Sequence, residues 1–343
     1  EGFDREHMAM PACQNELIRR VSQVQPNTVV VLHNGSPVEM PWASQVKGIL
    51  EAYLGGQAVG GAVCDILFGK VNPSAKLPET FPLKLEDNPS YLSYIGEGDV
   101  VEYREGIFVG YRYYDKKKMD VLFPFGHGLS YTTFAYSNLQ TDKDRMKDTD
   151  VMLVSVDVTN TGKMAGKEVV QLYVADQEST VIRPVKELRD FAKVELAPGE
   201  TKTVTFQLDK RAFAYYSVRI HDWHVESGAF DIMIGKSSRD IVLTKEVNIE
   251  STVELPFVYT TDTIMGDVLK DPRAAEIMKD ILKLDIFGGA KKKEETSAAS
   301  EAISEDMNAA MAKFMPLRGA VSFGGNVSMG DIQAIVDKLN GLV

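Results

Sequence analysis

The chain has 343 residues, and at roughly 100–200 residues per domain this length predicts two or three domains. The hydrophobic content of 44% and the charged content of 25% are close to globular averages, which excludes wholesale disorder and a collagen-like structure. The 38 Lys and Arg against 49 Asp and Glu give a net charge of −11, which repels a phosphate backbone or an anionic membrane, so we expect neither nucleic acid nor membrane as a partner.

The first region, residues 1–134, has the pattern of an α/β domain. Apolar residues at helical spacing over 14–25 are followed by a short β-branched run over 28–32, which predicts a helix and then a buried strand. A second strand is predicted over 46–53, followed by a helix of small residues over 58–68. This alternation predicts a parallel or mixed sheet covered by helices.

Beyond a connecting stretch over 71–131, which is rich in proline and aromatic residues, the apolar period changes to two. Alternating runs fill residues 135–250, with turn signals at Asn160-Thr161-Gly162, Pro198-Gly199 and Ser227-Gly228. This spacing predicts an all-β sandwich.

Residues 251–343 return to a helical pattern and predict a helical tail. Ser328 with Asp331 resembles a capping box in front of an apolar stripe over 332–339. Stripes of this kind are too apolar to stay solvated, so we expect the tail to dock on another domain or on a second subunit, as in a homo-oligomer. The charged, Ala- and Ser-rich stretch around 291–305 predicts a flexible linker.

Three further patterns have both a functional and a structural interpretation. Glycines over 55–61 could cradle a phosphate before a helix, but no phosphate-binding fingerprint is present, and close helix–strand packing is favoured. His221 and His224 have a metal-like spacing without a third ligand, which favours surface residues in a hairpin. Cys13 and Cys64 are too few for a disulfide framework and are expected to be buried thiols.

A family resemblance begins at the first residue. The run Glu1-Gly2-Phe3-Asp4-Arg5 resembles the Gly-Glu-Gly-(aromatic)-Asp-Arg segment of glycoside hydrolase family three, mainly the bacterial β-glucosidases. Further segments match the pattern of that family in order, at residues 27–38, 68–82, 105–115 and 123–132. The β region resembles the fibronectin type III-like domain of the same family through residues 169–174 and 186–191. The resemblance covers roughly residues 1–250.

The resemblance implies a retaining, exo-acting β-glycosidase whose full chain runs from a catalytic barrel through an α/β sandwich to a β-sandwich. Retention needs two carboxyl groups about 5–5.5 Å apart. In this family the nucleophile is a barrel Asp in a Ser-Asp-Trp-type motif, which this sequence lacks, whereas Glu1 matches the position of the acid/base. The implied partner is the N-terminal catalytic barrel portion of the same enzyme, and no cofactor or metal is implied.

The implied substrate is terminal β-linked glucose in glucosides or short β-glucans, with β-xylosides as the alternative. A non-catalytic carbohydrate-binding or assembly module is the alternative from another class. We expect Asp4 and Arg5 to pair and to orient the Glu1 loop. Trp42 has two interpretations, as a platform on which a sugar stacks or as a core residue.

The sequence starts at Glu1 instead of Met, so we expect it to be a piece of a longer protein. A signal peptide upstream of Glu1 would not be visible. The compartment is therefore left open, with the cytoplasm slightly favoured.

Overall fold

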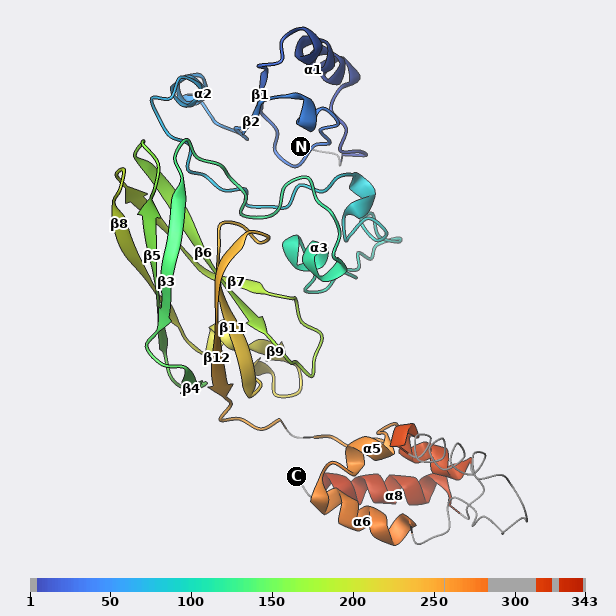
Figure 1. Cartoon of the computed structure of the whole chain (residues 1–343). Helices are drawn as coiled ribbons and strands as arrows, with labels where there is room; N and C mark the ends of the chain where they lie inside the picture. Colours follow the sequence, from blue (N-terminus) through green and yellow to red (C-terminus); the bar gives the residue numbers. More distant parts are fainter. Residues whose placement is uncertain (1–4, 256, 283–312, 323–326, 342–343) are drawn as a thin grey trace, which may run out of the picture. The chain divides into compact units, whose positions relative to one another are not determined.

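The structure is a computed structural model of the chain, and it describes all residues except 1–4, 256, 283–312, 323–326 and 342–343. The chain divides into two compact units, Glu1–Val253 and Glu254–Val343. The first unit holds an α/β part, a connecting segment and a β-sandwich, and the second unit is helical (Figure 1).

Two parallel strands form the centre of the α/β part. Its elements in chain order are α1 (Ala12–Val24), β1 (Val29–Leu32), the 3-10 helix η1 (Ala43–Gln45), β2 (Gly48–Glu51) and α2 (Val59–Leu67). In the parallel register Val30 lies opposite Ile49, and Leu32 lies opposite Glu51. The predicted order of helix, strand, strand and helix is confirmed, although β2 is shorter at both ends than predicted.

The α/β part buries a small apolar core beside these strands. Its buried members are Val30, Leu32, Val38, Met40, Trp42 and Phe81. Helices α1 and α2 bury none of their residues in the described structure, since a sheet of two strands covers little helix surface. Cys13 on α1 and Cys64 on α2 are therefore exposed, and the prediction that they are buried was wrong.

The glycines around the start of α2 differ in what requires them. A Cβ on Gly55 would lie 2.5 Å from Val59 Cγ2, so Gly55 allows a close approach to the first turn of α2. Gly60 and Gly61 have open space where a Cβ would stand, which contradicts the predicted close helix–strand contact. Gly56 has a φ of +66°, a left-handed conformation that favours glycine. Glycine is therefore required at Gly55 and Gly56, in the turn before α2, and not at Gly60 and Gly61 within the helix.

A connecting segment runs from the α/β part to the sandwich. It carries the 3-10 helix η2 (Leu85–Asp87) and the helix α3 (Tyr111–Lys117). The Asp115 side chain is 8% exposed and accepts hydrogen bonds from Lys186 Nζ at 2.8 Å and Arg239 Nε at 3.0 Å. The Tyr111 hydroxyl accepts a hydrogen bond from the backbone N–H of Leu188 at 2.8 Å. These contacts anchor α3 on the sandwich.

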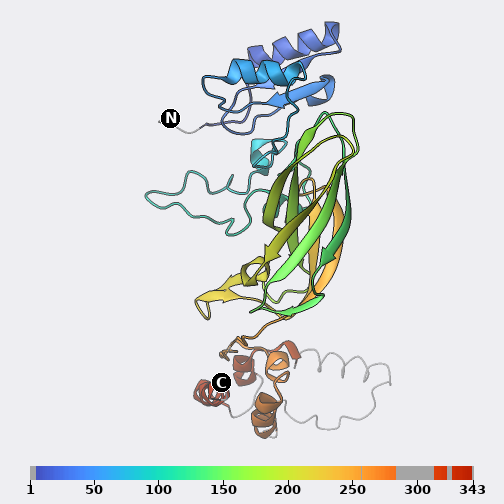
Figure 2. The ribbon, with the colours of Figure 1, turned by 90° about the vertical axis from the view of Figure 1, so that its left-hand side faces the viewer.

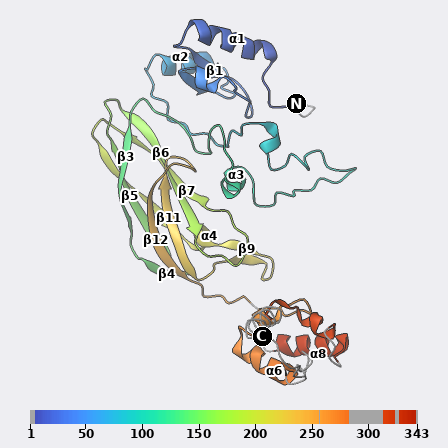
Figure 3. The same ribbon diagram turned by 45° about the vertical axis from the view of Figure 1, so that its right-hand side comes forward.

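Between η2 and α3 the chain forms a long loop, which projects from the connecting segment in Figures 2 and 3. Glu97 pairs with Val100 in a tight turn that has Gly96 and Gly98 at positive φ. Large apolar side chains along the loop are at least 45% exposed: Tyr91, Leu92, Tyr94, Ile95, Val100, Val101 and Tyr103. Residues 91–103 are called the apolar arm below. Exposed apolar side chains gathered on one loop make the apolar arm a candidate interaction surface.

The β-sandwich consists of two sheets packed face to face (Figure 2). One sheet has five strands in the order β4-β12-β11-β6-β7, and the other has three in the order β3-β5-β8. The strands are β3 (Phe134–Thr141), β4 (Arg145–Lys147), β5 (Met152–Asn160), β6 (Gly166–Asp176), β7 (Glu187–Leu196), β8 (Thr201–Leu208), β11 (Gly228–Gly235) and β12 (Ile241–Glu250). Neighbouring strands are antiparallel except for β12 and β4.

The alternation predicted from the sequence is the alternation of burial in the sandwich. On β5, Val154, Val156 and Val158 are fully buried, whereas the residues between them are partly open to solvent. Ile232 and Ile234 on β11 face the same core from the other sheet. The predicted all-β sandwich is confirmed.

A short hairpin follows the sandwich helix α4 (Lys210–Phe213). It pairs β9 (Tyr215–Ser217) with β10 (Asp222–His224). His221 is exposed, but His224 is buried, and the loss of hydration lowers the pKa of its imidazole. The prediction of a surface position was therefore wrong for His224. Within the described residues no group of three or more His, Cys, Asp or Glu could hold a metal ion.

The second unit is made of short helices. They are α5 (Met265–Val268), α6 (Pro272–Leu282), the 3-10 helix η3 (Leu317–Val321) and α8 (Met329–Asn340). The predicted capping box is present at the start of α8: Ser328 Oγ accepts from the Asp331 N–H, and the Asp331 carboxylate accepts from the Ser328 N–H at 2.8 Å.

The apolar stripe of α8 is buried inside this unit. Ile332, Val336 and Leu339 pack in one core with Val268 and Leu317. This packing removes the reason for expecting the stripe to need a barrel or a second subunit as its cover. The linker predicted around 291–305 lies outside the described residues.

Candidate functional site

The described structure begins at Arg5, so the predicted acid/base Glu1 and its neighbour Asp4 lie outside it. Arg5 Nη1 donates hydrogen bonds to Ser36 Oγ at 2.5 Å and to the carbonyl of Pro37 at 3.5 Å. Both acceptors belong to the turn that follows β1. The segment that leads to Glu1 is therefore tied to the edge of the sheet where β1 ends.

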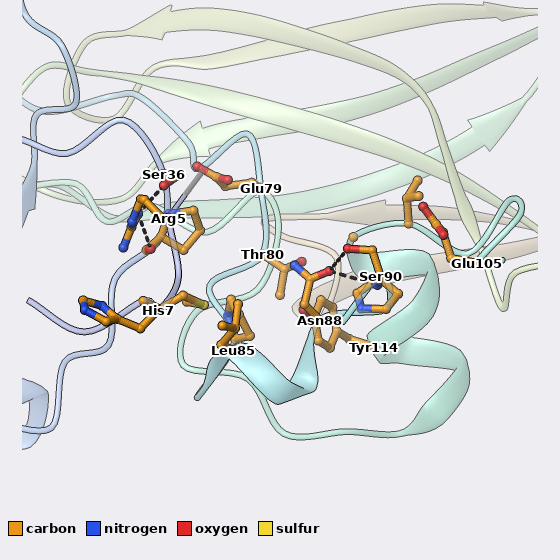
Figure 4. Close-up of a pocket in the computed structure, with 16 residues that line it drawn as sticks. Arg5, His7, Ser36, Glu79, Thr80, Leu85, Asn88, Ser90, Glu105 and Tyr114 are labelled. Carbon is orange, nitrogen blue, oxygen red and sulfur yellow. Dashed lines mark hydrogen bonds between the residues drawn. The ribbon is translucent and has the colours of Figure 1, made fainter. Parts of the chain in front are cut away.

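Arg5 lines a cavity of about 460 Å³ in the first unit (Figure 4). The lining comes from four places in the sequence, namely the Arg5 segment, the turn after β1, residues 79–90, and the end of the long loop with α3. Labelled examples in Figure 4 are Arg5, His7, Ser36, Glu79, Asn88, Ser90, Glu105 and Tyr114. The fold thus brings distant segments together beside the residues that follow Glu1.

The cavity presents several groups that form hydrogen bonds. Asn88 Oδ1 accepts from the N–H of Ser90 at 3.1 Å and from its hydroxyl at 2.8 Å. The Thr80 hydroxyl and Glu105 Oε2 are shielded from solvent and have no partner within the described residues. Burial raises the pKa of Tyr114 to about 12, so its phenol keeps its proton at neutral pH. Such a mixture suits a ligand rich in hydroxyl groups.

A chain of hydrogen bonds leads from the turn after β1 into the α/β part. Asn34 Nδ2 donates to the carbonyl of Ser36 at 2.9 Å and to Glu51 Oε2 at 3.2 Å. The Tyr53 N–H donates to Glu51 Oε1 at 2.9 Å, and the Tyr53 hydroxyl donates to Glu79 Oε1 at 3.0 Å. Loss of hydration raises the pKa of both carboxyls, and the charge of Glu79 adds to the rise at Glu51.

Glu51, Tyr53 and Glu79 give no sequence signal of a site. Glu51 and Tyr53 are two residues apart, but Glu79 stands 26 residues beyond Tyr53, so the three form no compact motif, although Glu79 lies inside the family-like stretch over 68–82. They meet in the folded structure because β1 pairs with β2 and because the chain passes the end of β2 again at Glu79.

Trp42 lies in the core of the α/β part. It is 2% exposed, and its indole N–H donates a hydrogen bond to Asn15 Oδ1 at 2.8 Å. Stacking of a sugar requires an open ring face. The buried position favours the interpretation as a core residue.

No helix in the described part of the chain is both long enough and apolar enough to cross a membrane.

Family comparisons agree with this arrangement of domains. Residues 1–131 match the glycosyl hydrolase family 3 C-terminal domain, and residues 168–238 match the fibronectin type III-like domain. These two domains define the class as the C-terminal region of a glycoside hydrolase. The chain belongs to glycosyl hydrolase family 3.

Relatives of known name extend well beyond this chain. Thermostable beta-glucosidase B of Acetivibrio thermocellus is 57% identical over 99% of this chain, which spans 44% of that protein. Exo-alpha-(1->6)-L-arabinopyranosidase of Bifidobacterium breve is 48% identical over 81% of this chain, which spans 36% of that protein. A crystal structure of the GH3 beta-glucosidase of Bifidobacterium adolescentis has a TM-score of 0.74 and 44% identity, with 81% of this chain and 41% of that chain covered. The chain thus spans less than half the length of these relatives.

Proposed function

We propose that this chain is the C-terminal portion of a retaining, exo-acting β-glycosidase of the β-glucosidase type, which removes terminal β-linked glucose from glucosides or short β-glucans. The observation that carries the proposal is the 57% identity to a β-glucosidase over almost the whole chain. In this proposal Glu1 is the acid/base, and the nucleophile belongs to a catalytic barrel upstream.

In the proposed reaction one carboxyl group is the nucleophile and the other transfers the proton. The nucleophilic carboxylate attacks the anomeric carbon and forms a glycosyl-enzyme, while Glu1 gives its proton to the departing glycosidic oxygen. Glu1, now a carboxylate, takes a proton from the water that attacks the glycosyl-enzyme, which releases glucose and restores both groups. Arg5, held by Ser36 and Pro37, and Asp4 are proposed to orient the loop that carries Glu1.

The proposed partner is the N-terminal catalytic barrel portion of the same enzyme. The apolar arm supports this proposal, because Ser90 and Glu105, which flank it on either side, line the same cavity as Arg5. The exposed apolar side chains of the arm therefore start beside the segment that leads to Glu1. We propose that they contact the barrel there.

The test uses the full-length enzyme with its barrel. Glu1→Ala should lower kcat/KM for cellobiose by about 10²–10⁴-fold, because the poor leaving group needs a proton. The variant should lose much less activity on an activated aryl β-glucoside, and azide should restore its turnover by forming a β-glucosyl azide. Glu6→Ala, which removes an exposed carboxylate from the same segment, is the matched control and should keep its activity.

Unimpaired cellobiose hydrolysis by Glu1→Ala would remove Glu1 from the mechanism. The isolated chain offers a second test, because an acid without its nucleophile stabilises little transition-state charge. Steady turnover of an aryl β-glucoside by the isolated chain would contradict the proposed division of the catalytic pair.

The relative that is named an arabinopyranosidase favours α-L-arabinopyranosides as a second candidate substrate class. The full-length enzyme should therefore be compared on aryl β-D-glucoside, β-D-xyloside and α-L-arabinopyranoside by kcat/KM. We expect the glucoside to rank first. Inactivity on all three, with binding of a β-glucan retained, would favour a non-catalytic carbohydrate-binding or assembly module.

A further inference from the structure

We infer that Glu51 is a positioning residue, which fixes the turn after β1 and, through Arg5, holds the Glu1 loop in its working place. This inference rests on the proposed role of Glu1. Its basis is that Ser36 binds both neighbours, since its hydroxyl accepts from Arg5 and its backbone carbonyl accepts from Asn34. The same Asn34 amide group donates to Glu51.

The parallel pairing of β1 and β2 places Glu51 where it can act. Glu51 is the last residue of β2 and lies opposite Leu32, the last residue of β1. Asn34 follows β1 by two residues, so both side chains stand at the same edge of the sheet. The Arg5 contact is made at this edge as well, through Ser36.

Glu51 is held from both sides by donors of fixed direction. Its two oxygens accept from Asn34 Nδ2 at 3.2 Å and from the Tyr53 N–H at 2.9 Å. Tyr53 has a φ of 44°, a costly left-handed conformation for a bulky residue. Strain of this kind persists where the surroundings over-determine the backbone, as two anchored carboxyls do here.

Two other titratable groups influence this carboxyl. Glu79 raises the pKa of Glu51, and His33 lowers it. Glu79 is itself fixed by the Tyr53 hydroxyl and lines the cavity together with Arg5 (Figure 4). The Glu51 side chain thus belongs to a network that ends at the cavity wall.

Glu51→Gln should weaken the hydrogen bonds that fix the turn after β1 without removing a proposed catalytic group. An amide has one acceptor oxygen, and both neighbours of Glu51 are donors, so one of them faces an NH₂ group. The turn that holds Arg5 then loses one of its supports. Small displacements of a catalytic group are costly in rate.

The experiment measures kcat/KM of full-length Glu51→Gln on cellobiose and on an activated aryl β-glucoside. A displaced acid/base predicts a loss of about tenfold on cellobiose and less than about twofold on the aryl glucoside. The alkaline limb of the pH profile on cellobiose should also move. Glu39→Gln, which changes a carboxylate near the same turn but outside the network, should match the wild type on both substrates.

A second variant separates the proposed positioning effect from a loss caused by misfolding. Ser36→Ala removes only the hydroxyl that accepts from Arg5, and it should show the same preference for the aryl glucoside at an unchanged melting temperature. Equal losses on both substrates, or no loss, in Glu51→Gln and Ser36→Ala would overturn the inference. If Glu1→Ala itself fails to discriminate between the substrates, the proposed function fails; if only the Glu51 and Ser36 variants fail to do so, this inference alone fails.

Discussion

The buried carboxylate of Asp115 is one of several contacts that attach α3 to the sandwich, and Asp115→Asn measures its contribution to stability. Asp115 and Lys186 are 8% and 11% exposed, so the substitution leaves a nearly buried ammonium without its counter-charge. Removing one partner of a buried pair costs about 3–5 kcal/mol. The low end, about 3 kcal/mol, applies here, because Asn keeps one acceptor oxygen and Arg239 is 31% exposed to water.

The expected loss can be measured as a fall in melting temperature. For a unit of this size 1 kcal/mol corresponds to about 2–4 °C, so Asp115→Asn should lower the transition of the first unit by about 6–12 °C. The fluorescence of Trp42 and Trp223 follows this unit, since both residues lie within it.

The matched control is Asp65→Asn. It breaks the Lys70–Asp65 pair at 3.1 Å, whose side chains are 74% and 43% exposed. Exposed pairs contribute about 0–1 kcal/mol, so the control should shift the transition by no more than about 4 °C. Equal shifts in the two variants would refute the claim that burial of the Asp115 pair anchors α3.

Three further predictions concern the core, the carboxyl pair and the helical unit. Ile232→Ala should destabilise the sandwich by about 3 kcal/mol in urea unfolding, because it opens a cavity in a fully buried position. The raised pKa values of Glu51 and Glu79 mean that the folded state holds these protons more tightly, so their contribution to the free energy of unfolding falls as pH rises from about 4.5. The double variant Glu51→Gln/Glu79→Gln should show a smaller fall across the same pH series, and an unchanged slope would contradict this. Ser328→Ala should cost the second unit about 1 kcal/mol in thermal unfolding through loss of its cap, and an unaltered transition would count against the capping box.

Local patterns in the sequence were sufficient to predict the layers of the fold. Alternating Val154, Val156 and Val158 gave the inward face of β5, since side chains of a strand point to opposite faces in turn. The capping box at Ser328 is likewise a local signal, because its two hydrogen bonds join residues three apart. The same kind of reasoning failed for Cys13 and Cys64, because the burial of a helix face depends on which elements lie against it.

The candidate site was likewise only partly predictable from the sequence. Glu1 and Arg5 could be found from the sequence by their resemblance to a family segment, since they stand in one short run. The anchoring of Arg5 by Ser36, and the network that ends at Glu51 and Glu79, could not be found that way. Parallel pairing brings the ends of β1 and β2 to one edge, and no local pattern records which side chains meet there. The sequence by itself therefore predicted the acid/base role that we propose for Glu1, and only the tertiary structure decided which distant side chains anchor Arg5.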